Sequence, residues 1–241
     1  MTLGPADATS PILLALGDCN TLGYGPLRGW TYVERVASVL GCPAVNRGFT
    51  MSTTREALGF LADHRGDRPG WMTVQYGLVD SWRTFRYAPY VLYFPDNPAR
   101  RLARKLVKHY KSTARRLGLN ALLGESHVVP VGEYEANLRA LIAGAGGARV
   151  CLIESPPTLE PRRNEALLTY NEVLARVAAG VGERCVLARC HRAFAEDAAG
   201  YLESDGVHLN ERGHDALARA VLEAWGLAVP SAFDPGEAVQ A

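Results

Sequence analysis

The stretch LALGDCNTLGYG, residues 14–25, decides the fold of this chain. Its first half belongs to an apolar run, 12–16, which predicts a buried strand. Its second half is a glycine-rich turn that places Cys19 directly after the strand. A cysteine at such a position is either a small buried residue that closes the strand or a nucleophile presented at a strand-to-helix turn.

Apolar runs and amphipathic segments alternate along the chain. Five short runs predict strands at residues 12–17, 43–46, 71–77, 149–155 and 184–190. Between and after them, apolar residues recur at helical spacing in three sets: Tyr32, Val36, Val39 and Leu40; Leu168, Val173, Leu174 and Val177; Leu217, Val221 and Trp225. This alternation predicts an α/β fold in which helices cover both faces of a parallel sheet.

Size and composition limit the function classes. The chain has 241 residues, 48% of them hydrophobic, which suits one α/β domain over residues 1–241. Its 26 basic and 25 acidic residues give no reason to expect a nucleic-acid or membrane partner. The first residues lack a signal-peptide pattern, and we expect a cytoplasmic protein.

The five cysteines are odd in number and scattered through strand-like segments, which favours reduced thiols over a disulfide framework. Cys185 and Cys190, with His191 beside the latter, lack a second ligand pair at a metal-binding spacing. We therefore expect neither a metal site nor a cofactor.

Polar, glycine-containing segments follow the first three predicted strands and precede the last helix. They are GDCNTLG at 17–23, NRGFT at 46–50, GLVD at 77–80 and SDGVH at 204–208. In an open α/β sheet, ligands bind beyond the carboxyl ends of the strands. The four segments should therefore meet at one edge of the sheet.

In this order the segments resemble the blocks of the SGNH, or GDSL, hydrolases. Residues 17–23 resemble the first block, Gly-Asp-Ser-x-Thr-x-Gly, with Cys19 in place of the nucleophilic serine. Residues 46–48 resemble the second block, and 205–208 resemble the last, Asp-x-x-His. The resemblance covers most of the chain and implies a three-layer, flavodoxin-like fold with a five-stranded parallel sheet.

The third block departs from the family pattern. The family usually has Gly-x-Asn-Asp, whereas this chain has Val79 where the asparagine would donate a hydrogen bond to the oxyanion. Substitute donors could be Gln75, Asn20 or Ser81. The residues expected to contact substrate are Asp18, Asn20, Gln75, Val79, Ser81 and Arg83.

The chemistry of a Cys-His-Asp triad fits the remaining residues. Cys19 would be the nucleophile, His208 the base, and Asp205 the acid that fixes the histidine tautomer. A helix N-terminus and a nearby imidazolium would both lower the pKa of the Cys19 thiol. The resemblance implies an oxyanion hole made of the backbone N–H groups of Cys19 and Gly48.

These residues together predict an acyl ester or thioester hydrolase or acyltransferase that forms a thioester acyl-enzyme. The resemblance makes carbohydrate or secondary-metabolite acyl chemistry plausible, with a small-molecule ester or thioester that could be linked to a phosphate or a carrier protein. The alternative is an SGNH-like binding protein that has lost catalysis, which the departures at Cys19 and Val79 motivate. A third interpretation is that Cys19 replaces a natural serine to trap an acyl intermediate.

An insertion at about 81–148 is long for one crossover connection. Within it, Leu102, Leu106, Tyr110, Ala114 and Leu117 form one helical stripe among many basic residues. The simpler interpretation is an amphipathic helix whose basic face is solvated. The functional alternative is a cap that docks an anionic group. On position in the sequence, Arg83 and Arg86 lie closer to the third strand and are better placed than this helix to contact substrate.

Overall fold

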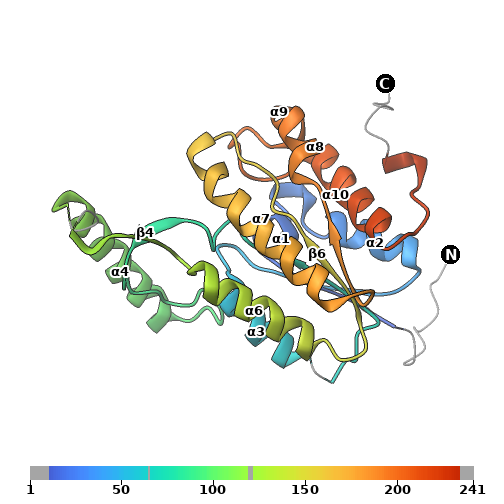
Figure 1. Cartoon of the computed structure of the whole chain (residues 1–241), viewed down its shortest axis with the longest axis horizontal. Coiled ribbons are helices and arrows are strands. Elements are labelled where there is room, and N and C mark those ends of the chain that lie inside the picture. Colours follow the sequence, from blue (N-terminus) through green and yellow to red (C-terminus); the bar gives the residue numbers. More distant parts are fainter. Residues whose placement is uncertain (1–10, 65, 119–121, 234–241) are drawn as a thin grey trace.

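The computed structural model describes residues 11–64, 66–118 and 122–233. Its central feature is a parallel sheet in the order β2-β1-β3-β6-β7 (Figure 1). The strands are β1 (Leu13–Gly17), β2 (Ala44–Gly48), β3 (Trp71–Gln75), β6 (Arg149–Ile153) and β7 (Cys185–Ala188). This order is the flavodoxin-like one, so the predicted fold class and five-stranded sheet are confirmed. The predicted domain, 1–241, extends beyond the described ranges.

Helices cover both faces of the sheet (Figure 1). They are α1 (Cys19–Leu22), α2 (Tyr32–Leu40), α3 (Thr54–Asp63), α4 (Pro98–Arg116), α6 (Val131–Gly144), α7 (Pro161–Val181), α8 (His191–Glu196), α9 (Ala198–Tyr201) and α10 (Glu211–Ala224). The described residues also form two short 3₁₀ helices, η1 (Gly25–Leu27) and η2 (Ser231–Phe233). No helix in the described ranges is long and apolar enough to cross a membrane.

The apolar run in β1 supplies both cores because successive side chains point to opposite faces of a strand. Leu14 and Leu16 enter the core beneath α3, α6 and α7, whereas Leu13 and Ala15 enter the core beneath α2 and α10. All four residues are fully buried. Burial on both faces explains why the strand reads as a continuous apolar run rather than an alternating one.

Most residues of the three helical stripes predicted between and after the strands are buried, but Val39 of α2 is 36% exposed. Val173, Leu174 and Val177 of α7 are buried, but Leu168 is 51% exposed. Its neighbour Leu167 is buried instead and packs toward the carboxyl end of β1. The apolar residue at 168 was thus wrongly assigned to the core face.

The carboxyl ends of β1, β2 and β3 meet where the strand order reverses. β1 lies between β2 and β3, so the turns that follow these strands flank one crevice. The turn after β1 approaches the end of β2 very closely. A Cβ added to Gly48 would lie 2.1 Å from the Leu22 nitrogen, so only glycine fits at this position.

The chain leaves the main sheet after β3. Residues Arg83–Phe85 (β4) and Glu125–His127 (β5) pair in an antiparallel ribbon, and α4 lies between them in sequence. In Figure 1 this segment projects from one end of the molecule, away from both termini. The projecting part falls within the predicted insertion, whose remainder forms α6 and packs on the sheet beside α3 and α7.

Substituting two glycines with opposite surroundings tests this packing. We expect Gly48→Ala to lower the free energy of unfolding by more than about 2 kcal/mol, because the methyl group has no space. Gly59→Ala, at an exposed position within α3 with open space around it, should raise it by about 0.5–1 kcal/mol. Urea unfolding measures both, and equal effects would contradict the close approach of α1 to β2.

Candidate active site

Cys19 lies at the tip of β1 and begins α1. Asp18 caps this short helix by accepting a hydrogen bond from the Asn20 N–H at 2.9 Å. The Cys19 side chain packs against Leu78, Leu167 and Val207 and is only 9% exposed. The sulfur therefore stands at the expected place, and aliphatic groups cover most of it.

His208 and Asp205 form a close pair in the loop before α10. The ring Nδ1 of His208 lies 2.5 Å from Asp205 Oδ2. The other oxygen, Oδ1, accepts the backbone N–H of Val207 and of His208 at 2.9 and 3.0 Å. These hydrogen bonds fix the carboxylate and leave Nε2 of the ring for a substrate or nucleophile.

Asn20 joins the Cys19 turn to the His208 loop. Its amide Nδ2 donates to the Val207 carbonyl at 3.4 Å, and its Oδ1 accepts the Leu209 N–H at 3.0 Å. Both partners are sequence neighbours of His208, so one side chain holds the loop on each side of the histidine. Within the described ranges no hydrogen bond joins the Cys19 sulfur to His208 itself.

The Tyr24 ring stacks on His208, with centroids 4.4 Å apart and planes 13° from parallel. Sequence reasoning did not identify Tyr24, because nothing in a glycine-rich turn indicates which ring it meets. Sequence reasoning also missed that Asn20 acts as a link between segments. Its position beside the nucleophile suggested substrate contact instead.

The electrostatics of Cys19 differ from expectation. Burial, followed by the charge of Asp18, raises the pKa of the Cys19 thiol well above its ordinary value, although the N–H groups of Cys19 and Asn20 act in the opposite direction. The prediction of a lowered pKa is therefore wrong for the resting protein. A helix of four residues offers too little compensation for the loss of solvent.

The pKa values of the two acidic residues near Cys19 and His208, Asp18 and Asp205, shift in opposite directions. Burial raises the pKa of Asp18 to about 7, and the Asn20 N–H only partly offsets it. Asp205 is different: partial burial opposes ionisation, but the hydrogen bonds from His208 and Val207 hold its pKa below the ordinary value. Asp205 is thus the carboxylate that stays charged beside the imidazole.

The groups expected to donate hydrogen bonds to the oxyanion differ in their present hydrogen-bond partners. The Gly48 N–H donates to Asn46 Oδ1 at 2.9 Å, whereas the Cys19 N–H lies where it favours a thiolate. Gln75 is fully buried, and its Oε1 accepts from Thr21 Oγ1 at 3.0 Å.

The other expected substrate contacts lie in different places. Ser81 is buried, and its hydroxyl donates to the Leu78 carbonyl at 3.2 Å. Arg83 is half exposed and pairs with Glu165 at 3.3 Å. Val79 lines a cavity under α4. The structure thus brings Asp18, Cys19 and Asn20 together with the His208 loop but directs Arg83 elsewhere.

Comparison with known protein families shows which family this chain belongs to. Residues 15–216 match the GDSL-like lipase/acylhydrolase family. The chain belongs to this family. The resemblance carried by the four blocks is thereby confirmed.

Solved structures of similar proteins share the fold of this GDSL-family protein. The lipase/acylhydrolase from Enterococcus faecalis is 18% identical, with a TM-score of 0.61 over 91% of this chain and 98% of that one. An acetylxylan esterase from Geobacillus stearothermophilus, solved as a catalytic mutant, is 21% identical, with a TM-score of 0.62 over 95% and 98%. A hydrolase from the Lake Arreo metagenome is 23% identical, with a TM-score of 0.60 over 91% and 96%. No curated protein matches the sequence.

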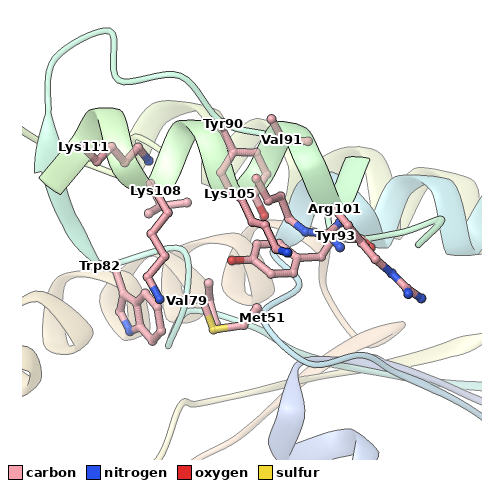
Figure 2. Close-up of a pocket in the computed structure, with 12 residues that line it drawn as sticks. Met51, Val79, Trp82, Tyr90, Val91, Tyr93, Arg101, Lys105, Lys108 and Lys111 are labelled. Atoms are coloured by element: carbon pink, nitrogen blue, oxygen red, sulfur yellow. The ribbon is translucent and has the colours of Figure 1, made fainter. Parts of the chain in front are cut away.

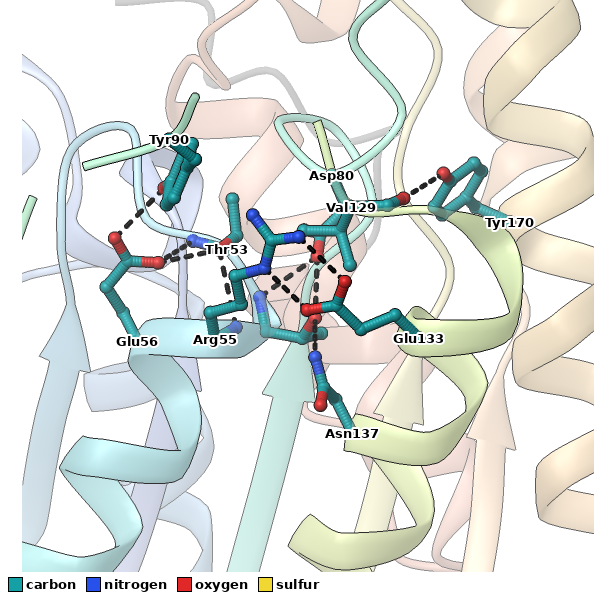
Figure 3. A network of polar contacts seen from close by, with 10 residues as sticks. Thr53, Arg55, Glu56, Asp80, Tyr90, Val129, Glu133, Asn137 and Tyr170 are labelled. Atoms are coloured by element: carbon teal, nitrogen blue, oxygen red, sulfur yellow. Dashed lines mark hydrogen bonds and ion pairs between the residues drawn. The ribbon is translucent and has the colours of Figure 1, made fainter. Parts of the chain in front are cut away.

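The third block of this GDSL-family protein is anchored to the first turn of α3 (Figure 3). Asp80 Oδ1 accepts the N–H and the hydroxyl of Thr54 at 3.0 and 2.7 Å. The adjoining Arg55 forms a two-pronged ion pair with Glu133 of α6, at 2.5 and 2.7 Å. Val79 is therefore held in place by its neighbour Asp80.

Asp80 gives the protein a testable pH dependence. Burial raises its pKa to about 6, so the folded state holds a proton that the unfolded state releases near pH 4. Stability should fall as pH rises from about 4 to about 6. The Asp80→Asn variant cannot lose this proton and keeps the Oδ1 acceptor. Its free energy of unfolding relative to the wild type should rise by about 2–3 kcal/mol between pH 4 and pH 7.

Denaturant unfolding at the two pH values makes the comparison. Asp63→Asn, at an exposed position that ends α3, is the control and should follow the wild type at both. A pH-independent difference between Asp80→Asn and the wild type would show that Asp80 is already charged at pH 4.

Proposed function

We propose that this protein hydrolyses or transfers acyl groups of esters or thioesters through a Cys19-His208-Asp205 triad and a thioester acyl-enzyme. Its family supports an enzyme acting on acyl esters. The observation that carries the specific proposal is the 2.5 Å His208–Asp205 pair, held against the Cys19 turn by Asn20. An acid-oriented imidazole beside a nucleophilic side chain is the arrangement that acyl transfer requires.

The reaction proceeds in two stages, the acylation of Cys19 and the release of the acyl group. The Cys19 sulfur attacks the substrate carbonyl carbon while its proton passes to His208 Nε2, giving a tetrahedral intermediate. The intermediate collapses, the bond to the leaving oxygen or sulfur breaks, and His208 returns the proton to that atom. Water or an acceptor alcohol, thiol or amine then attacks the thioester. It gives its proton to His208, which passes it to the released Cys19 sulfur.

The raised pKa of Cys19 determines how the first step is activated. A thiol that stays protonated at rest needs a base at the moment of attack, so His208 acts on the thiol rather than forming a permanent ion pair with it. Asp205, held charged by its hydrogen bonds, stabilises the imidazolium that forms.

The developing oxyanion has fewer side-chain donors than is usual in the family. We place the oxyanion against the Cys19 N–H. The Gly48 N–H is the second backbone donor once it turns from Asn46 Oδ1 to the oxyanion. Loss of one donor typically costs about 10²–10³ in rate when the nucleophile is oxygen. The intrinsic reactivity of sulfur offsets part of this loss.

A binding protein without catalysis is the second candidate. Two observations favour it: the covered, high-pKa thiol and the apolar Val79 in place of an oxyanion donor. The two candidates differ in one measurable respect, which is whether Cys19 becomes acylated.

Intact-mass spectrometry after mixing the protein with an activated acetyl thioester decides between them. The triad predicts one acetyl adduct on the wild type and none on Cys19→Ala. Asp205→Asn should slow adduct formation by about 10- to 1000-fold, because the imidazole loses its orientation and charge partner. Cys42→Ala, which removes another thiol that is not fully buried, is the matched control and should acylate like the wild type.

Two results would refute the triad. One is an adduct that persists in Cys19→Ala. The other is an unmodified wild type whose esterase activity survives that substitution. An unmodified, inactive wild type would instead establish the binding protein.

A further inference from the structure

A cavity of about 570 Å³ lies between α4 and the carboxyl end of β3 (Figure 2). Its roof is a row of cations on α4, namely Arg101, Arg104, Lys105, Lys108 and Lys111. The opposite side is apolar and aromatic and includes Met51, Val79, Trp82, Tyr90 and Tyr93. In Figure 2, Lys108 extends from the helix toward Trp82, and Lys105 extends toward the two tyrosines.

Helix α4 lines the cavity with its basic face. The cations recur three or four residues apart and share one face, which lines the cavity. Leu102, Leu106 and Leu117 of the apolar stripe are exposed by 60%, 63% and 70%, whereas Ala114 is buried and Tyr110 packs against Phe85. The basic face is solvated as predicted, because Lys105 and Lys108 are exposed, and it also lines the cavity. Arg83 lies outside the cavity lining.

Few negative charges balance these cations. Asp96 pairs with Arg101 and Arg104, at 2.7 and 2.5 Å. Within the described ranges, Lys105 and Lys108 have no ion-pair partner. No acidic residue lines the cavity itself. Lysines gathered over low-dielectric walls create a positive potential that attracts an anion.

The tyrosines that form part of the cavity are fixed to the main body. Glu56 Oε1 accepts a hydrogen bond from the Tyr90 hydroxyl at 3.0 Å (Figure 3). The same oxygen accepts the Tyr93 N–H at 2.8 Å. The other oxygen of Glu56 caps α3 through Thr53. The Glu56 carboxylate is thus occupied behind the tyrosines and does not pair with Lys105 or Lys108.

The apolar side of the cavity adjoins the candidate active site. Val79 lines the cavity, and the preceding residue, Leu78, packs against Cys19. Cys19 and His208 themselves are outside the cavity lining. The cavity therefore provides room for the part of a substrate that is not reacting.

We propose that this cavity binds the phosphate of a small phosphorylated acyl donor, with the phosphate at Lys105 and Lys108 and the acyl end directed past Val79 toward Cys19. The acyl part of this inference rests on the proposed function, whereas the phosphate part does not. The volume lies within the range of small-molecule sites, and the combination of aromatic walls with several cations suits a ligand that has an apolar body and a multiply charged end.

Binding of two probes that differ by one phosphate tests the proposal. Phosphopantetheine and pantetheine both carry a free thiol but no acyl group, and titration calorimetry with the Cys19→Ala protein measures binding without chemistry. Phosphopantetheine should bind at least about tenfold more tightly, and the advantage should shrink as salt is raised. The double variant Lys105→Ala/Lys108→Ala should lose that advantage and leave pantetheine binding unchanged.

A second double variant controls for net charge. Arg116→Ala/Arg192→Ala removes two exposed cations that do not line the cavity, and it should keep the tenfold preference. Thermal unfolding confirms that each variant folds. Equal affinity for the two probes would overturn the phosphate site. So would an equal loss of the phosphopantetheine preference in both double variants.

Kinetics separate this inference from the proposed triad. With wild-type Cys19, the Lys105→Ala/Lys108→Ala variant should lower kcat/KM about tenfold for S-acetylphosphopantetheine and leave it unchanged for S-acetylpantetheine. If Cys19→Ala still prefers phosphopantetheine to pantetheine and also still hydrolyses the acetylated substrates, the triad is refuted and the phosphate site stands. Binding of a phosphopantetheine-bearing carrier protein without binding of free phosphopantetheine would overturn the small-molecule proposal.

Discussion

The arrangement of the candidate active site depends on the two hydrogen bonds of Asn20. They connect the turn after the first strand to the backbone on both sides of His208, across almost the whole chain. Without this connection the loop of residues 204–208 would be positioned by the His208–Asp205 pair and the Tyr24 stack, both of which lie at its surface. A nearly buried amide that is satisfied on both ends restricts the loop more strongly than an exposed contact can.

The first turn of α3 connects the candidate active site to the cavity under α4. Thr54 holds Asp80 and thereby Val79, and Thr53 with Glu56 holds the segment that carries Tyr90 and Tyr93. Consecutive residues of one helix turn thus position the third block and the aromatic wall. Because both are fixed to the same rigid element, the distance between Cys19 and the aromatic wall is set by the main fold and not by the projecting ribbon.

Much of the fold could be predicted from the sequence, but the electrostatics of the site could not. The five apolar runs, beginning with residues 12–16, predict the strands of the sheet. A strand that is buried on both faces has a continuous apolar sequence, which is easy to recognise. The Asp205–His208 spacing likewise predicts a local pair, which the structure contains. The raised pKa of Cys19 arises from Leu78, Leu167 and Val207, which lie far apart in sequence, so no local pattern contains it. The cavity beneath the basic face of α4 depends on where this helix lies relative to the sheet, which its amphipathic pattern does not determine.

In the proposed mechanism, His208 removes the proton from a thiol that is neutral at rest. The most direct measurement is the single-turnover rate of Cys19 acylation as a function of pH, in the wild type and in His208→Ala. At neutral pH the variant should acylate more slowly than the wild type, and its rate should keep rising into the alkaline range because its thiol must ionise without a base. Identical pH profiles in the two proteins would contradict it.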